Sequence, residues 1–371
     1  MFSQRVERVR TAMRAEGVDA VLLSVGPDLP WLTGFTAMAQ ERLTMLVLPR
    51  EGAPTLVVPS FETERVVDRE KLLTLSPWGE TDDPVELVAD ALGGAATGRL
   101  AIGDHTWSRF LVALQRRLAS GSWTDAGSVL GPLRAAKDDA EIDALARAGA
   151  GVDVVATELQ NGDIPLIGRS ETEVAADLRA RILDNGHTRV NFCIVASGPN
   201  SSSPHHDTGD RVIQAGEPVL FDFGGTTAEP VGQPGYCSDT TRMVFTGDPP
   251  EEFTEAYEAL AAAQEAGYQA AQVGTPAEEV DRAARDVLTS AGLGAYFLHR
   301  LGHGIGVEGH EDPYLVGGNA EPLEAGNAFS IEPGFYIQGR WGARIEDIVV
   351  ATADGPRRLI NSSRRLAIVE A

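Results

Sequence analysis

The spacing of hydrophobic residues in the first third of the chain predicts a mixed α/β domain. A helix capped by Ser3 and ended at Gly17 is predicted because apolar residues recur between them with helical spacing. The unbroken apolar run over residues 20–25 predicts a buried strand. Further short strands, of which the first two form a hairpin, are predicted at residues 44–48, 55–58 and 100–102.

In the rest of the chain, helices are predicted before strands. A long helix is expected to begin at Lys137, and a second one to begin with the capping-box pair Ser170 and Glu173 and to stop at Gly186. Strands are then predicted at 189–196, 217–223 and 238–245, helices at 251–272 and 276–291, and short strands from 328 to 350. This pattern is typical of an α+β domain.

The length of 371 residues is enough for two domains, each with its own core. The stretch 126–136 loses hydrophobic periodicity, which places the boundary near residue 134. We therefore predict one domain over residues 1–133 and a second over residues 134–371.

The charge balance excludes some classes of partner. The chain has 31 Lys and Arg against 54 Asp and Glu, a formal net charge of −23. Nucleic acid and anionic membrane surfaces are therefore not expected as partners, since Lys and Arg supply most of the affinity for phosphate. The N-terminus has no apolar signal segment and no run is long enough for a membrane span, so a cytoplasmic protein is expected. Cys193 and Cys237 are expected to be buried small hydrophobes.

Acidic residues interrupt several predicted strands. Asp222, Glu332 and Glu346 each lie inside an otherwise apolar run, and Asp239 lies at the start of another strand. Burying an ionised carboxylate costs several kcal/mol unless a cation offsets the charge, so these residues suggest a shared cation. His303, in a glycine-rich segment, adds one imidazole to the set.

A site rich in oxygen ligands with a single imidazole favours Mn²⁺, with Co²⁺, Zn²⁺ or Fe²⁺ as alternatives. Four carboxylates can neutralise and bridge two such ions. Water held between two ions loses a proton far more readily than bulk water, whose pKa is about 15.7, and the ions also polarise a carbonyl. The residues thus predict a two-metal hydrolase that needs no Ser or Cys nucleophile.

Five segments in order resemble the signatures of the pita-bread metallopeptidases, in the branch of prolidase and aminopeptidase P. They are FDFGG (221–225), SDTTR (238–242), GHGIGVEGH (302–310), IEPGFY (331–336) and RIED (344–347). The resemblance extends over essentially the whole chain and implies a creatinase-like N-terminal domain before an α+β pita-bread catalytic domain. Methionine aminopeptidases fit less well because they typically lack such an N-terminal domain.

The resemblance also assigns a role to each metal-binding candidate. It implies that Asp239 and Glu346 bridge two metal ions, that Asp222 binds one of them, and that His303 and Glu332 bind the other. Glu332 would in addition exchange a proton with the attacking water.

On the substrate side, the resemblance implies that His205, rather than His206, contacts substrate and that His310 steadies the tetrahedral intermediate. Arg344 resembles an arginine that supports the site or binds a substrate carboxylate, although it could be an ordinary charge partner of Glu346 or Asp347. Tyr336 resembles a tyrosine that lines the same pocket and could equally be a packed strand aromatic; neither alternative is excluded by sequence. The interval from Asp222 to Asp239 is longer than is usual in the family, because TTAEPVGQPGY (226–236) adds residues. We expect a longer hairpin loop there, turned by Gly232, Pro234 and Gly235.

The function implied is hydrolysis of Xaa-Pro bonds by a metal-bridging hydroxide. A prolidase would act on dipeptides and an aminopeptidase P on longer peptides, and the proline-containing peptide would be the main partner of a homodimer. The alternatives are a creatinase-like small-molecule hydrolase or lyase, a non-catalytic peptide-binding scaffold on the same fold, and an aminopeptidase with no proline requirement.

Overall fold

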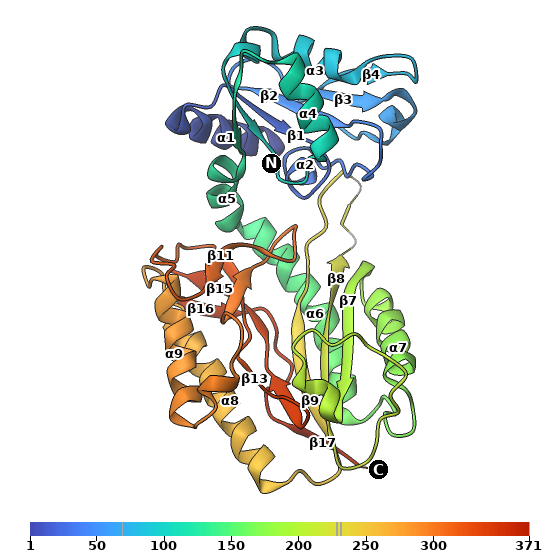
Figure 1. Cartoon of the computed structure of the whole chain (residues 1–371), viewed down its shortest axis with the longest axis vertical. Coiled ribbons are helices and arrows are strands. Elements are labelled where there is room, and N and C mark those ends of the chain that lie inside the picture. The colour runs from blue at the N-terminus through green and yellow to red at the C-terminus, as the bar shows by residue number, and fades with distance from the viewer. Residues whose placement is uncertain (69, 228, 231, 371) are drawn as a thin grey trace. The chain divides into compact units, whose positions relative to one another are not determined.

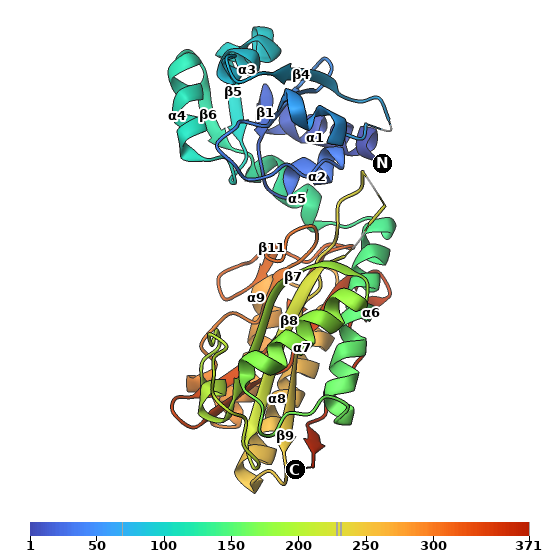
Figure 2. The ribbon, with the colours of Figure 1, turned by 90° about the vertical axis from the view of Figure 1, so that its right-hand side faces the viewer.

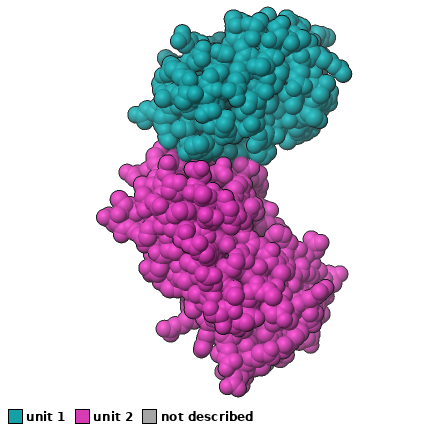
Figure 3. Space-filling view, turned by 60° about the vertical axis from the view of Figure 1, so that its left-hand side comes forward, with its two compact units in different colours: residues 1–134, 229–234 teal, residues 135–228, 235–371 magenta. Residues whose placement is uncertain are grey.

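The computed structural model of the chain describes residues 1–68, 70–227, 229–230 and 232–370. They fold into two compact units (Figure 3). The first contains residues 1–134 together with residues 229–234, and the second contains residues 135–228 and 235–371. The two-domain architecture expected from sequence is therefore present. The assignment of part of the β-hairpin connection to the first unit was not expected.

In the described part of the first unit, six strands form a mixed sheet in the order β4-β3-β2-β1-β5-β6 (Figures 1 and 2). The strands are β1 (Ala20–Leu23), β2 (Met45–Pro49), β3 (Thr55–Pro59), β4 (Thr74–Trp78), β5 (Arg99–Ile102) and β6 (Ser122–Asp125). The helices are α1 (Phe2–Glu16), α2 (Asp28–Thr33), α3 (Pro84–Leu92), α4 (Ser108–Arg117) and α5 (Gly127–Ala135), with short 3₁₀ turns at Ser60–Arg65 and Gly93–Thr97. Strands β2 and β3 pair antiparallel, which confirms the predicted hairpin. Apolar residues of α3 and α4 pack on this sheet.

One local prediction for this unit was wrong. Ser3 does not cap the first helix: the carboxylate of Glu70 accepts hydrogen bonds from the backbone N–H groups of Phe2, at 3.1 Å, and Ser3, at 2.8 Å. The helix does end at Gly17, which has φ 65°. The stretch without periodicity forms helix α5 despite an internal proline, Pro132.

The second unit contains four long helices among its described residues. They are α6 (Asp139–Asn161), α7 (Glu171–Asp184), α8 (Glu251–Ala270) and α9 (Ala277–Ser290). The capping box of Ser170 and Glu173 is formed, and Asp138 and Glu141 make another at the start of α6. Helices α8 and α9 lie on one side of the strands, and α6 and α7 on the other (Figures 1 and 2).

The strands between these helices form two sheets and one hairpin. The described residues give a four-stranded sheet, β17-β9-β8-β7, a five-stranded sheet, β11-β10-β12-β15-β16, and the pair β13-β14. The strands are β7 (His187–Ser197), β8 (Pro218–Thr227), β9 (Thr240–Thr246), β10 (Gly302–Gly304), β11 (Glu311–Leu315), β12 (Ala328–Ile331), β13 (Gly334–Ile337), β14 (Trp341–Arg344), β15 (Asp347–Thr352), β16 (Gly355–Arg358) and β17 (Ala367–Val369). A backbone bridge between Thr241 and Glu346 joins the two sheets. That junction brings the acidic segments together.

The connection between β8 and β9 is the segment where a longer hairpin loop was expected. Positions 228 and 231 lie outside the described residues. The backbone N–H of Gln233 donates to the carbonyl of Pro230 at 3.0 Å, and Gly232 has φ 80°. Gly232 therefore belongs to the turn, as expected, whereas Pro234 and Gly235 follow it. Strands β8 and β9 pair antiparallel on either side.

The expectation for the two cysteines is confirmed. Cys193 and Cys237 are both buried free thiols. In the part of the chain that the structure describes, no helix is both long and apolar enough to cross a membrane.

Candidate metal centre

The five residues expected to bind metal converge at the junction of the two sheets. Asp222 lies on β8, Asp239 just before β9 and His303 on β10, while Glu332 and Glu346 lie at the ends of neighbouring strands. One ligand atom each from Asp222, Asp239 and Glu346 lie within 4.8 Å of one another, as do those of His303, Glu332 and Glu346. Glu346 belongs to both groups, so the two groups share one carboxylate.

Three of these carboxylates are buried, and they raise one another's pKa. Burial and the nearby Glu346 raise the pKa of Asp239 well above its ordinary value. Burial and the carboxylates of Glu332 and Asp222 do the same to the pKa of Glu346. The set holds more negative charge than a buried site accommodates without a cation.

One oxygen supports a metal ion more directly. Asp222 Oδ1 is buried and has no hydrogen-bond partner among the described residues. A buried carboxylate oxygen without a partner is costly unless a ligand takes that place. The donor set of this junction therefore fits hard divalent cations.

Arg344 offsets part of the charge and is fully enclosed. Its Nη2 donates to Asp222 Oδ2 at 2.6 Å, and its Nε donates to Thr241 Oγ1 at 2.9 Å. Its Nη1 donates to the Tyr336 hydroxyl at 2.7 Å and to the Pro204 carbonyl at 3.2 Å. The charge partner of Arg344 is thus Asp222, rather than Glu346 or Asp347.

His303 and Glu332 form the other side of the centre. His303 Nε2 lies 3.2 Å from Glu332 Oε1 and 3.7 Å from Asp239 Oδ2. His303 Nδ1 lies 3.1 Å from the Gly304 carbonyl, an acceptor, so Nδ1 carries the hydrogen and Nε2 faces the carboxylates. Burial alone would raise the pKa of Glu332, but the hydrogen bond and charge of His303 lower it to about 2.

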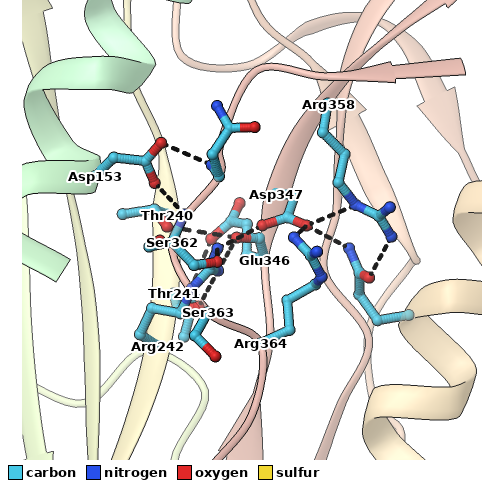
Figure 4. Close-up of polar contacts among 12 residues, drawn as sticks. Asp153, Thr240, Thr241, Arg242, Glu346, Asp347, Arg358, Ser362, Ser363 and Arg364 are labelled. Atoms are coloured by element: carbon cyan, nitrogen blue, oxygen red, sulfur yellow. Dashed lines mark hydrogen bonds and ion pairs between the residues drawn. The ribbon is translucent and has the colours of Figure 1, made fainter. Parts of the chain in front are cut away.

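The backbone carbonyl and the carboxylate of Glu346 both accept hydrogen bonds from neighbouring side chains (Figure 4). Thr241 Oγ1 donates to Glu346 Oε2 at 2.8 Å, and Arg242 Nη1 donates to the Glu346 carbonyl at 2.6 Å. Arg242 Nη2 also donates to Asp347 Oδ1 at 2.6 Å, and both side chains of this pair are fully buried. Arg358 and Arg364 donate to the other oxygen of Asp347, each at 3.1 Å. Arg242 and Asp347 thereby fix the strand that presents Glu346.

The metal-binding candidates line a cavity of about 490 Å³ within the second unit. His205, His310 and Arg344 line it as well. The rings of His303 and His310 have centroids 3.8 Å apart, and desolvation and His303 lower the pKa of His310 to about 4. Tyr336 is not a lining residue and reaches the site through Arg344.

Sequence reasoning missed part of the cavity wall. His299, Arg300, Phe192 and Ile194 also line it. His299 Nε2 lies 3.0 Å from the Tyr336 hydroxyl. In the sequence, His299 is marked only by its position in the segment that leads to His303. His206, by contrast, is bonded to the buried Glu171 at 2.8 Å and is not a lining residue.

The family comparison agrees with this geometry. Residues 142–353 match metallopeptidase family M24, and residues 5–136 match the creatinase/prolidase N-terminal domain. The chain belongs to metallopeptidase family M24. Both expected domain types, including the pita-bread catalytic domain, are thereby confirmed.

Individual relatives of this M24 chain extend over nearly its full length. A probable dipeptidase PepE of Mycobacterium tuberculosis is 42% identical over 372 residues, which cover 100% of this chain and 97% of that protein. An Xaa-Pro dipeptidase of Lactobacillus helveticus is 33% identical and the match covers 98% of each chain. The crystal structure of a prolidase from Thermococcus sibiricus superposes with a TM-score of 0.92 at 35% identity, over 100% of this chain and 99% of that one. The M24 chain is therefore a metallopeptidase and a hydrolase.

Proposed function

We propose that this M24 chain is a dinuclear Xaa-Pro dipeptidase of the prolidase type. The observation that carries the proposal is the cluster of Asp222, Asp239, Glu332, Glu346 and His303 in one cavity, where Asp222 Oδ1 has no partner among the described residues. The names of the relatives favour a dipeptidase over an aminopeptidase P, since the three named above are called a probable dipeptidase, an Xaa-Pro dipeptidase and a prolidase.

Asp222 would hold one ion and His303 with Glu332 the other, with Asp239 and Glu346 shared between the two. The place of Glu346 in both ligand groups supports this division. When bound, the ions would supply Lewis acidity, which would lower the pKa of nearby water and polarise the scissile carbonyl. Mn²⁺ suits the oxygen-rich set best, with Co²⁺, Zn²⁺ or Fe²⁺ as alternatives.

The remaining residues would act on the proton and the substrate. Glu332 would accept the proton of the attacking water and return it to the leaving proline nitrogen. His310, neutral at pH 7 because its pKa is about 4, would donate a hydrogen bond to the oxygen that becomes charged. His205 would contact the substrate from the opposite loop. Arg344 and Tyr336 would keep Asp222 in place at the border of the substrate pocket.

The test compares proline release from Ala-Pro with alanine release from Ala-Pro-Ala. Chelator-stripped protein is assayed before and after addition of Mn²⁺, Co²⁺ or Zn²⁺. Metal-dependent cleavage of the dipeptide alone is expected. Preference for the tripeptide would make the chain an aminopeptidase P. Cleavage of Ala-Leu with equal efficiency would remove the proline requirement. No cleavage of any peptide would leave the creatinase-like or scaffold reading.

We also propose that the protein works in the cytoplasm as a homodimer, with domains at residues 1–133 and 134–371. Light scattering on purified protein tests the dimer, and fractionation of cells tests the compartment. The proposed boundary predicts that residues 134–371 fold when they are expressed alone, and expression of that fragment tests it.

A further inference from the structure

The cavity contains a second arginine whose surroundings differ from those of Arg344. Arg300 lines the cavity three positions before His303 and is half-buried. Its guanidinium stacks on the ring of Tyr314, with Cζ 4.3 Å from the ring centroid. No hydrogen bond or ion pair of its side chain to any described residue is found, so its N–H donors are available to a ligand in the cavity.

Arg344, by contrast, has few N–H donors left for a substrate. Four of the five N–H donors of a guanidinium are engaged by Asp222, Thr241, Tyr336 and the Pro204 carbonyl. The side chain is also almost completely buried. A substrate carboxylate could bind Arg344 only by displacing these partners, and displacing Asp222 would disturb the metal centre.

The backbone around Arg300 is fixed by hydrogen bonds, although its side chain has no polar partner among the described residues. Arg285 Nη2 donates to the His299 carbonyl at 2.8 Å, and the N–H of Leu301 donates to Asp281 Oδ1 at 2.9 Å. Arg285 and Asp281 are paired with each other on α9. A guanidinium on a fixed backbone and an aromatic face loses little freedom when it binds a planar anion.

The charge of the cavity makes such a cation useful. With two dications bound the four carboxylates of the junction are neutralised, but a substrate carboxylate that leaves water for this cavity still needs a cationic partner, and the donors of Arg344 are already engaged. In a dipeptide the carboxylate directly follows the scissile bond, whereas a longer peptide has a neutral amide at that point. A cation in the same cavity can therefore tell the two substrates apart.

We propose that Arg300, stacked on Tyr314, binds the free C-terminal carboxylate of a dipeptide and makes the enzyme a dipeptidase. The inference rests on the peptidase function proposed above. Arg300 is here a specificity-determining residue: it takes no part in the proton transfers and contacts the end of the substrate that leaves with the proline.

The test uses Mn²⁺-loaded full-length enzyme with Ala-Pro and its C-terminal amide, which differ only in the carboxylate. For Arg300→Ala we expect KM for Ala-Pro to rise roughly 10- to 100-fold, the worth of a charged hydrogen bond. kcat for Ala-Pro, and both constants for the amide, should change little. Arg300→Lys should restore only part of the affinity, because lysine keeps the positive charge but lacks the paired N–H donors of a guanidinium. Tyr314→Phe should behave like wild type, and Tyr314→Ala should raise KM for Ala-Pro alone.

Arg282→Ala is the matched control, since Arg282 is an exposed arginine paired with Glu279 on α9. Metal content and melting temperature verify that each variant is folded and loaded. Equal losses for acid and amide in Arg300→Ala, or no loss for either, would overturn the role of Arg300 and leave the prolidase proposal intact. If wild type cleaves Ala-Leu and not Ala-Pro, the proline proposal fails, and Ala-Leu with its amide then tests Arg300. If no peptide is cleaved, both proposals fall.

Discussion

The two walls of the cavity differ in how their side chains are held. The metal wall is the side of the cavity with the metal-binding candidates, where Asp222 and Glu346 are buried. Asp222 accepts a hydrogen bond from Arg344 and Glu346 accepts one from Thr241, and Arg344 also donates to Thr241. On the substrate wall, Arg300 is half-buried and His205 and His310 are exposed.

This difference separates two kinds of function. On the metal wall, the hydrogen bonds to Asp222 and Glu346 can keep these two side chains in place before any ion arrives. The substrate wall keeps donors available for a ligand that comes and goes. Substitutions on the metal wall should therefore change metal content or stability, whereas those on the substrate wall should change kinetics alone.

The largest effect is expected from Asp239→Asn, which changes a carboxylate that belongs to one ligand group with Asp222 and Glu346 and lies 3.7 Å from His303 Nε2 of the other. Activity should fall by more than the roughly 1,000-fold upper limit for loss of a single transition-state donor, because both ions are disturbed. The metal-to-protein ratio, measured by atomic emission, should fall with it. Full metal content at normal affinity in this variant would contradict the ligand role of Asp239.

Asp347→Asn tests the support behind the metal wall. It leaves the buried Arg242 without its charge partner, and breaking a buried pair in this way costs about 3–5 kcal/mol. The free energy of unfolding, measured in denaturant, should fall by that amount. Asp153→Asn, which weakens bonds to the backbone of Asn361 and Ser362 nearby, is the control with a smaller expected loss. Equal losses of unfolding free energy in the two variants would show that the Arg242–Asp347 pair stabilises the fold no more than the bonds of Asp153 do.

The pH dependence of stability should separate metal-free from metal-loaded protein. In the metal-free protein the pKa values of Asp239 and Glu346 are raised, so the stability present below their ordinary values is lost as pH rises through the folded values. Bound metal favours the ionised carboxylates and has the opposite effect. The gap in melting temperature between loaded and stripped protein should therefore widen from pH 5 to pH 8. A constant gap would show that these carboxylates do not bind the ion.

His310→Ala tests the substrate wall. We expect kcat to fall about 100-fold, as for the loss of one donor to a developing oxyanion, with metal content and melting temperature unchanged. His206→Gln is the control, because His206 bonds Glu171 and is not a lining residue. A loss of bound metal in His310→Ala would instead place His310 on the metal wall, where its group with Asp239 and His303 would allow it.

The metal wall could be predicted from sequence and the substrate wall only in part. Carboxylates inside apolar strands must meet a cation, so Asp222 and Glu346 carry their own signal. Arg300 has none, since its meaning depends on which donors remain free after folding. The partner of Arg344 was also beyond reach, because Asp222 is 122 positions away and the pairing depends on how β8 and β14 meet. Glu70 caps a helix 67 positions before it for the same reason.

The smallest effect on activity is expected in the connection between β8 and β9. Gly232 has φ 80°, and a Cβ there would meet Val67 Cγ1 at 3.2 Å, within the first unit. Gly168 has φ 84° with nothing within 4 Å, so Gly168→Ala carries the backbone strain without the contact. Each alanine should cost about 1–2 kcal/mol of unfolding free energy from the left-handed backbone, and Gly232→Ala slightly more. Because Asp222 lies on β8, Asp239 directly precedes β9 and the two strands pair antiparallel, kcat/KM should stay at the wild-type value in both variants. A fall in kcat/KM confined to Gly232→Ala would mean that the connection shapes access to the cavity.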